Sequence, residues 1–515
     1  MTGGSNGGGV PAHAADLRRW LALGFVLFAV AVPVIDNTVL TVAIPRIIDD
    51  LDTDVTSVQW VFTGYALTFA SVLVIGGRLG DMFGPRRILV VGASLFGLGS
   101  LIAAVSTSLP MLIGGEAVIE GVGAALMVPN TMSLIARTFQ GRQRIAAFAA
   151  YATVLGAASS IGPVIGGYLT TYHSWRWSFG INVFIAPIVI AGLLFTTDRD
   201  SAGGDRQRLD IRGAVLIASG TFLVVFGLTQ GPSYGWWRPT DPLTIAGQDI
   251  WPVSAPISIV PVAFLAGVGL IVLFCRTEIS LERRDAHPLF EFSQFRFRTF
   301  RLANIATFCM AFAQLGVALS ISLFLQESKD LTPMQNGLWV LPTGLAIFVG
   351  APAGGWVSRR IGAITTMRIG ATVNVVGLFL VASVLSSDLG YGYVLPTFVV
   401  YGFGAGMVSS QITRVLLHDI APARSGAASG INTTARQTAT ALGVATIGTI
   451  FATVADSRGF HAALWPAMLA ASVALIASAA VMWRLPQIDD EAHILDRGRV
   501  ADRHHDISVA TTVEA

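Results

Sequence analysis

The chain has 515 residues, of which 53% are hydrophobic and only 12% are charged, and its net charge is +2. Soluble domains carry about a quarter charged residues, so this composition leaves too little charge to cover a water-facing surface. The small net charge gives no basic excess for a nucleic-acid partner. The two cysteines, Cys275 and Cys309, lack the spacing of a metal site or a disulfide framework, and we expect no cofactor and no bound metal.

The chain begins with a polar stretch rich in glycine and alanine, Met1–Asp16, which has no cleavable signal-peptide pattern. Fourteen runs of about 20 mostly apolar residues follow, the length that a helix needs to cross the hydrocarbon core. They are 20–44, 57–77, 88–108, 110–135, 145–170, 178–197, 211–230, 256–275, 300–326, 333–357, 365–386, 391–416, 426–453 and 463–484. Lipid-embedded segments must satisfy their own backbone groups, so the sequence predicts an all-α polytopic membrane protein.

The distribution of basic residues orients these spans. If the N-terminus is cytoplasmic, 27 of the 33 basic residues fall in cytoplasmic segments, 5 fall in outer loops, and Arg436 lies inside a span. Cytoplasmic loops carry the excess of lysine and arginine in membrane proteins. The sequence therefore predicts both termini in the cytoplasm of a bacterial cell, with the spans in its inner membrane. An odd number of spans would destroy this alternation.

Two segments recur at similar offsets and indicate an internal repeat. The segment 76–87, after the second span, resembles 354–368, after the tenth, and 121–125 resembles 402–406. Two six-helix halves with two additional helices between them explain both offsets, and such halves commonly hold a substrate site near the midplane. The predicted parts are a cytoplasmic N-terminus 1–19, a six-helix bundle 20–197, a linker with two extra helices 198–298, a second bundle 299–484, and a cytoplasmic tail 485–515.

The outer loop of the inserted pair, Gly231–Pro252, carries Trp236, Trp237 and Trp251. It could act as a lid or entry element for substrate, or its tryptophans could form an aromatic belt at the membrane interface. We favour the belt.

Four motifs occur in order along the first half. They are 36–45 (DNTVLTVAIP), 77–87 (GRLGDMFGPRR), 162–167 (GPVIGG) and 175–182 (WRWSFGIN). Together they resemble the major facilitator superfamily, and within it the fourteen-helix drug:proton antiporters. The resemblance covers essentially the whole chain. It implies two six-helix bundles that alternate access to a central site, and a monomer in the lipid bilayer.

Two of these motifs suggest mechanical roles. In the loop of the second motif, Gly77 and Gly84 would permit a tight turn and close helix approach, and Asp81 would pair with Arg86 or Arg87 as a latch that breaks during gating. These arginines would also determine topology. In the third motif, which resembles the family's antiporter motif, small residues would let a neighbouring backbone approach and the proline would bend the helix. The residues are Gly162, Pro163, Gly166 and Gly167; ordinary packing and a part in coupling are equally supported.

Ionisable residues inside spans are functional hypotheses by default. Asp36 in the first span, Glu116 and Glu120 in the fourth, and Arg436 in the thirteenth meet this criterion. The three carboxylates fall at similar depth in the outer half, and Glu116 and Glu120 share one helix face. If that face lines the central cavity, they form a cluster in which like charges cannot all ionise. Such a group would carry a proton and, once ionised, attract a cationic substrate, while Arg436 would hold one carboxylate ionised.

The resemblance also exposes a departure. The family normally has an arginine, linked to proton coupling, where this chain has Glu116, and commonly a glutamine at Glu120. Coupling would then be rebuilt around the carboxylates and Arg436, or the chain would serve another substrate or ion. The alternative structural role for these charges is to pair and hold helices together.

Amides within spans are further candidates for the cavity, although single amides more often join helices. The candidates are Asn304, Gln314, Gln411 and Asn432, together with Asn374 and Gln437. The sequence shows no nucleotide-binding loop and no arrangement typical of an enzyme. It therefore predicts proton-coupled efflux of amphipathic, cationic compounds. The alternatives are an exporter of lipid or another endogenous metabolite, and a membrane sensor or scaffold that does not transport.

Overall fold

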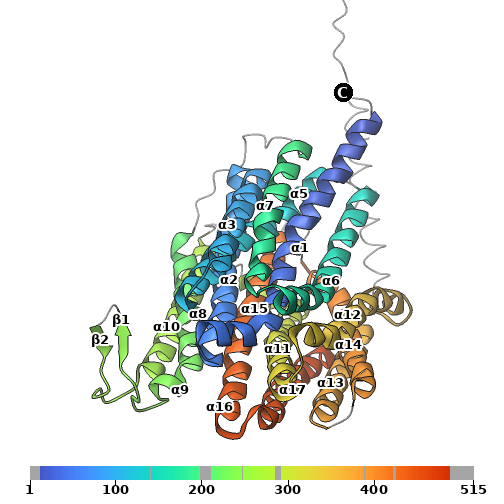
Figure 1. Ribbon diagram of the computed structural model, residues 1–515. Coiled ribbons are helices and arrows are strands. Elements are labelled where there is room, and N and C mark those ends of the chain that lie inside the picture. The colour runs from blue at the N-terminus through green and yellow to red at the C-terminus, as the bar shows by residue number, and fades with distance from the viewer. Residues whose placement is uncertain are drawn as a thin grey trace, which may run out of the picture.

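The computed structural model describes residues 12–139, 141–197, 210–245, 248–284, 292–387, 390–420 and 425–487. The first half contains α1 (Ala12–Leu51), α2 (Val55–Phe83), α3 (Pro85–Ala104), a span built of α4 (Leu109–Leu112), the π-helix η1 (Ile113–Glu120) and α5 (Gly121–Thr138), then α6 (Gly141–Tyr172) and α7 (Arg176–Thr196). These helices form the upper part of the molecule in Figure 1, and their shared core lies around Phe69, Phe96 and Tyr151.

The inserted segment contains α8 (Ile211–Thr229), a short α9 (Gly231–Tyr234), a hairpin of β1 (Leu243–Ile245) and β2 (Gln248–Trp251), and α10 (Ile259–Arg283). The two long helices pack against each other, and α8 contacts α2 through Trp60 and Phe222, whose ring centroids are 5.8 Å apart. The hairpin projects beyond them at the lower left of Figure 1. Trp236 and Trp237 are exposed, as an aromatic belt requires. The helix of the second inserted span continues beyond the predicted span end at 275, to Arg283.

The second half contains η2 (Phe292–Arg296), α11 (Arg298–Leu323) continued by η3 (Phe324–Ser328), α12 (Pro333–Ile361), α13 (Ala363–Leu385), α14 (Tyr391–Leu416), α15 (Ser425–Gly443) continued by η5 (Val444–Gly448) and α16 (Thr449–Arg458), and α17 (Phe460–Trp483). They occupy the lower part of Figure 1. The turn between α12 and α13 uses Gly362 at φ 83°, and the matching turn between α2 and α3 uses Gly84 at φ 97°. Both conformations favour glycine, and they agree with the predicted repeat.

Twelve helical segments among the described residues are long and apolar enough to cross a membrane. Each coincides with a predicted span. The other two predicted spans fall in α2 and α6, which are 29 and 32 residues long and include side chains outside the described set. The all-helical membrane architecture is therefore confirmed, whereas the count of fourteen and the division into parts stay predictions.

The two halves meet mainly through three sets of helix contacts. The helix α6 packs on α12, α2 packs on α15 and η5, and α1 packs on α11. Several hydrogen bonds cross between the halves. Among them, Ser322 donates to the Thr41 carbonyl, the Met334 N–H donates to Thr171, and Thr449 at the start of α16 donates to Gln59. All six residues lie near the same end of their helices, the end that carries the loops 52–54 and 329–332. We call it the closed end.

Candidate functional site

The three predicted carboxylates meet inside the first half. Asp36 comes from α1, and Glu116 and Glu120 come from η1; one oxygen of each lies within 4.8 Å of the others. Their exposed fractions are 2%, 1% and 0%. The prediction that they cluster is therefore confirmed. The prediction that they line an open cavity is wrong for this conformation, because all three are sealed among helices of one bundle.

The π-helix brings its two glutamates into contact with α3. Gly99 on α3 and Gly115 on η1 lie backbone to backbone, so that a side chain at either position would collide with the opposite helix. π-helical segments are rare in proteins, and those that occur are often at functional sites. Here the wider turn spans Ile113–Glu120 and contains both glutamates. The local structure thus sets the depth of two of the three acids.

Neutral donors hold two of the acids. Asn182 of α7 donates a 2.6 Å hydrogen bond to Asp36 Oδ1, and Ser100 of α3 donates a 2.8 Å bond to Glu120 Oε2. The Tyr65 side chain of α2 interacts electrostatically with all three acids. Three further oxygens, Asp36 Oδ2, Glu116 Oε2 and Glu120 Oε1, are buried and have no donor among the described residues. Unpaired buried oxygens are costly, so the cluster needs protons or a cation.

Sequence reasoning did not identify these donors. Asn182 ends the motif that starts at Trp175, and Asp36 begins another motif, so two separate motifs meet in one hydrogen bond. Ser100 and Tyr65 belong to no motif. Their role depends on helix packing, for which the sequence gives no direct signal.

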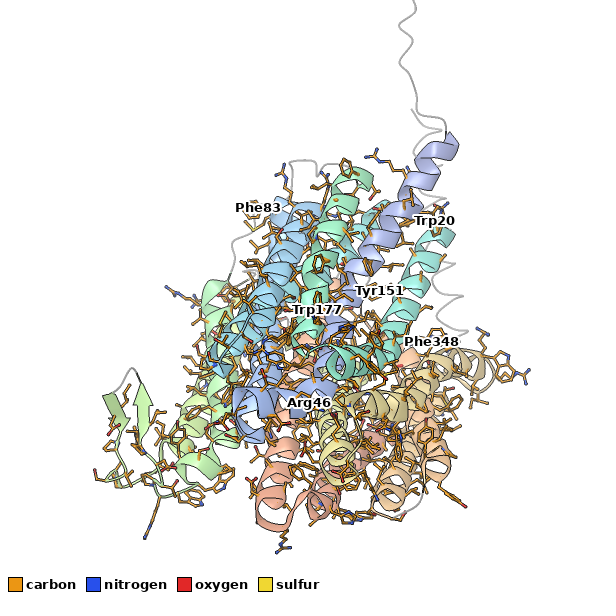
Figure 2. The ribbon with its side chains drawn as sticks, viewed as in Figure 1. Trp20, Arg46, Phe83, Tyr151, Trp177 and Phe348 are labelled. Carbon is orange, nitrogen blue, oxygen red and sulfur yellow. The ribbon has the colours of Figure 1, made fainter. Side chains whose placement is uncertain are left out.

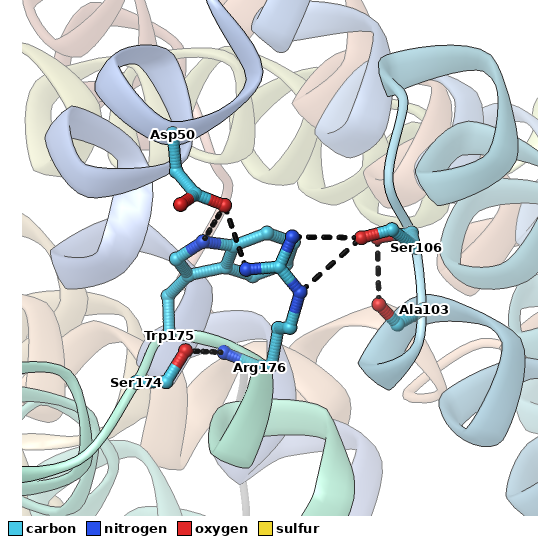
Figure 3. A network of polar contacts seen from close by, with 6 residues as sticks. All are labelled: Asp50, Ala103, Ser106, Ser174, Trp175 and Arg176. Atoms are coloured by element: carbon cyan, nitrogen blue, oxygen red, sulfur yellow. Dashed lines mark hydrogen bonds and ion pairs between the residues drawn. The ribbon is translucent and has the colours of Figure 1, made fainter.

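A second polar network joins α1, α3 and α7 at the closed end (Figure 3). Arg176 of α7 forms a 2.6 Å ion pair with Asp50 of α1 and donates two hydrogen bonds to the Ser106 carbonyl, which follows α3. Trp175 Nε1 donates to the same carboxylate at 3.2 Å, and the guanidinium stacks over its ring. The network therefore ties together the helices that supply Asp36, Ser100 and Asn182.

Arg436 does not join the carboxylates. It lies on α15 in the second half, its side chain is exposed, and its electrostatic partner is Tyr151 on α6. Figure 2 marks Tyr151 within the first half. The expectation that Arg436 holds one of the acids ionised is therefore wrong, because the acids interact with one another inside the first half.

The predicted cavity amides separate into two groups. Asn432 Nδ2 donates a 3.1 Å hydrogen bond to Asn304 Oδ1, which joins α15 to α11. Gln314 is exposed, whereas Gln411 is buried and donates to its neighbour Ser410. The structure brings only the first two together.

The loop between α2 and α3 is where the latch is predicted. Gly84 adopts the left-handed conformation, Gly77 is half-buried, and Arg86 donates a 2.7 Å hydrogen bond to the Leu194 carbonyl near the end of α7. Arg87 is exposed. The side chain of Asp81 lies outside the described residues, so its pairing stays a prediction.

Asn130 was missed by sequence reasoning although it secures this region. It lies on α5 and donates to the Gly76 carbonyl at 2.9 Å, and Gly80 leaves room for its side chain. This polar contact fixes α5 against α2.

The glycines of the third motif contact both halves. Gly162 and Gly166 pack on Thr38 and Val39 of α1, within the first half. Gly167 faces the backbone of Pro333 and Met334, and the Pro163 carbonyl faces Gly337 of α12. A side chain at either interfacial glycine would meet backbone atoms of the other half. The motif therefore permits a close contact between α6 and α12, which belong to different halves.

Comparison with known proteins places this geometry in a family. Residues 26–444 match the model of the Major Facilitator Superfamily. The chain belongs to the Major Facilitator Superfamily. It is 31% identical to the "Probable actinorhodin transporter" of Streptomyces coelicolor, over 86% of this chain and 74% of that protein. Members of this superfamily are transporters, and the carboxylate cluster is a feature of the transporter's first half.

Two further relatives are named as exporters. The chain is 29% identical to the "Tetracenomycin C resistance and export protein" of Streptomyces glaucescens, over 86% of this chain and 78% of that protein. It is also 29% identical to the "Multidrug efflux pump LfrA" of Mycolicibacterium smegmatis, over 94% of this chain and 91% of that protein. The similarity to these superfamily members extends through both halves of the chain.

Proposed function

We propose that this chain exports amphipathic toxic compounds by alternating access and that protons drive the export. The similarity to antibiotic exporters and to a multidrug efflux pump supports the export of such compounds. The observation that carries proton coupling is the buried cluster of Asp36, Glu116 and Glu120. The cluster provides titratable groups that are sealed from water and that have no basic partner among the described residues.

The chemistry follows from charge repulsion. Three carboxylates whose oxygens lie within 4.8 Å cannot all be ionised in a low-dielectric site. Asn182 and Ser100 stabilise the charged forms of Asp36 and Glu120 by donating hydrogen bonds. Among the described residues Glu116, unlike the other two acids, has no hydrogen bond from a neutral side chain, and its Oε2 is buried without a donor. We assign it the exchangeable proton, which leaves when the cluster opens to water.

The orientation of the chain gives the cycle its direction. The excess of arginine on one side supports cytoplasmic termini, and with that orientation the closed end faces the outside. The described conformation is then closed toward the outside. The cluster takes up its proton from the outside in the outward-open state, and after the halves rock into the described conformation it releases that proton toward the cytoplasm.

The energy is sufficient for concentrative export. One proton that crosses the membrane gains about 2.3 kcal/mol per 100 mV, and a pH unit adds about 1.4 kcal/mol. Together these terms sustain a gradient of roughly a hundredfold or more for a neutral compound.

The test uses purified protein in liposomes and three pyrene probes of one shape: pyrenebutyrate, its neutral amide, and the matching trimethylammonium. We expect an imposed pH gradient to drive at least one probe across the membrane. Glu116→Gln and Glu120→Gln should each abolish this movement with normal expression, whereas Asp241→Asn, in an exposed loop, should leave it intact. If a sodium gradient, but not a pH gradient, moves a probe, the coupling ion is sodium and not the proton. If no gradient moves any probe, the export proposal is wrong.

A further inference from the structure

Arg436 is a charged residue inside a predicted span that the carboxylate mechanism does not use. Its side chain is exposed, and it makes no hydrogen bond or ion pair within the described part of the chain. A charge at membrane depth is expensive and normally faces a water-filled space or a partner. Its position therefore requires an explanation.

The helix contacts show which helices lie beside Arg436. The two halves touch through α6 with α12 and, separately, through α2 with α15. Arg436 belongs to α15, whereas its electrostatic partner Tyr151 belongs to α6. Arg436 and Tyr151 therefore lie in opposite halves, on helices that belong to two different interhelix contacts. The exposed guanidinium on α15 lies near enough to α6 to interact with Tyr151 across the two halves.

The described residues one turn before and one turn after Arg436 on α15 are polar but neutral. One turn earlier on α15 is Asn432, half-buried and bonded to Asn304 of α11; one turn later is Thr440, also half-buried. The buried acids interact with one another inside the first half and leave this charge without a counterion there. A guanidinium offers five donors in a planar fork that matches a carboxylate or a similar anion.

We infer that Arg436 binds an acidic group of the exported compound, so that the cargo is an amphipathic anion such as a carboxylate, phenolate or sulfonate. This inference rests on the proposed export function and names its substrate class. It replaces the expected cationic cargo, which depended on the carboxylates lining the cavity. Exit of an anion and entry of a proton are both favoured by a membrane potential that is negative inside, so the two movements support each other.

The test measures binding of the three pyrene probes to the full chain in nanodiscs. We expect the wild-type protein to bind pyrenebutyrate at least about tenfold more tightly than the neutral amide, the size of one charge-assisted hydrogen bond. Arg436→Gln should abolish this difference and leave amide binding unchanged. Arg436→Lys should retain part of it, because lysine keeps the charge but loses the fork. The control Arg458→Gln alters an exposed arginine at the other end of the same span and should change nothing.

Two results would overturn the inference. One is unchanged pyrenebutyrate binding in Arg436→Gln, which would mean that the side chain only reaches toward the membrane surface. The other is tighter binding of the trimethylammonium probe than of pyrenebutyrate by the wild-type protein. If gradients move the trimethylammonium probe alone, the export proposal stands and the anion site fails. If pyrenebutyrate binds through Arg436 but no gradient moves any probe, the site stands and the export proposal fails.

Discussion

The Ser322 hydroxyl donates a 2.7 Å hydrogen bond to the Thr41 carbonyl across the two halves of the protein. In a regular helix that carbonyl would accept the backbone N–H four residues later, but residue 45 is proline and has none. Asn336 and Gln326 of the second half donate to the same hydroxyl, and Gln326 also donates to the Val42 carbonyl. The proline in α1 thus creates the acceptor that the second half uses to close this end.

We therefore predict that Ser322→Ala shifts the protein toward states that are open at this end. A net hydrogen bond contributes about 0.5–1.5 kcal/mol, which corresponds to a shift of about two- to tenfold in the conformational equilibrium. Spin labels at the exposed positions Thr107 and Tyr393, with Cys275 and Cys309 replaced by serine, report the separation of the halves. We expect a larger population at long distance.

The matched control for this shift is Ser320→Ala. Ser320 is buried on the same helix, but its hydroxyl donates to the Gly316 carbonyl within that helix. Equal distance distributions for the two variants would contradict a special role for the Thr41 acceptor.

The interfacial glycines give a steric prediction. Gly167→Ala places a methyl group against the backbone of Pro333 and Met334, so the closed end cannot form unless the helices separate. We expect transport of the pyrene probes to fall at least tenfold while the protein still folds, because alanine itself favours a helix over glycine. Gly355→Ala, at a helical glycine with open space around it, should transport normally. Normal transport by Gly167→Ala would show that the close contact is dispensable.

Removal of a donor from the cluster should move the pH dependence of transport. Ser100 donates to Glu120, and a donor favours the ionised carboxylate. In Ser100→Ala the ionised form is less stable, so the carboxyl keeps its proton to higher pH. We expect the pH profile of transport to shift to higher pH. Ser94→Ala, an exposed serine of the same helix that bonds to the Val90 carbonyl, should leave the profile in place. A shift to lower pH would contradict the assignment.

The network in Figure 3 predicts a modest loss of stability. Exposed ion pairs contribute about 0–1 kcal/mol, but Arg176 also donates two hydrogen bonds to the Ser106 carbonyl. We expect Arg176→Lys to lower the melting temperature of the purified protein by a few degrees, because lysine keeps the charge and loses the fork. Arg238→Lys in the exposed outer loop is the control. An unchanged melting temperature for Arg176→Lys would show that the fork contributes nothing to stability.

Some of this site could be predicted from the sequence because membrane depth is encoded by position along a span. The similar depths of Asp36, Glu116 and Glu120 correctly predicted that they meet. The twelve confirmed helices follow from apolar length in the same way.

The rest depends on how helices rotate about their axes, which position along a span does not determine. The acids turn into the first bundle, toward Ser100 and Asn182, instead of into the space between the halves. Arg436 turns away from them and toward Tyr151. The Thr41 carbonyl is another example, since Pro45 predicts a free acceptor but the sequence does not identify its donor on α11.

The central claim is that the buried carboxylates carry the coupling proton. Its most direct test counts the protons that cross the liposome membrane for each probe molecule transported, with a pH indicator inside. For the wild-type protein we predict a fixed ratio of at least about one, as a coupled proton carrier requires. For the double variant Glu116→Gln/Glu120→Gln we predict that proton movement ceases. An unchanged ratio in the double variant would contradict the account.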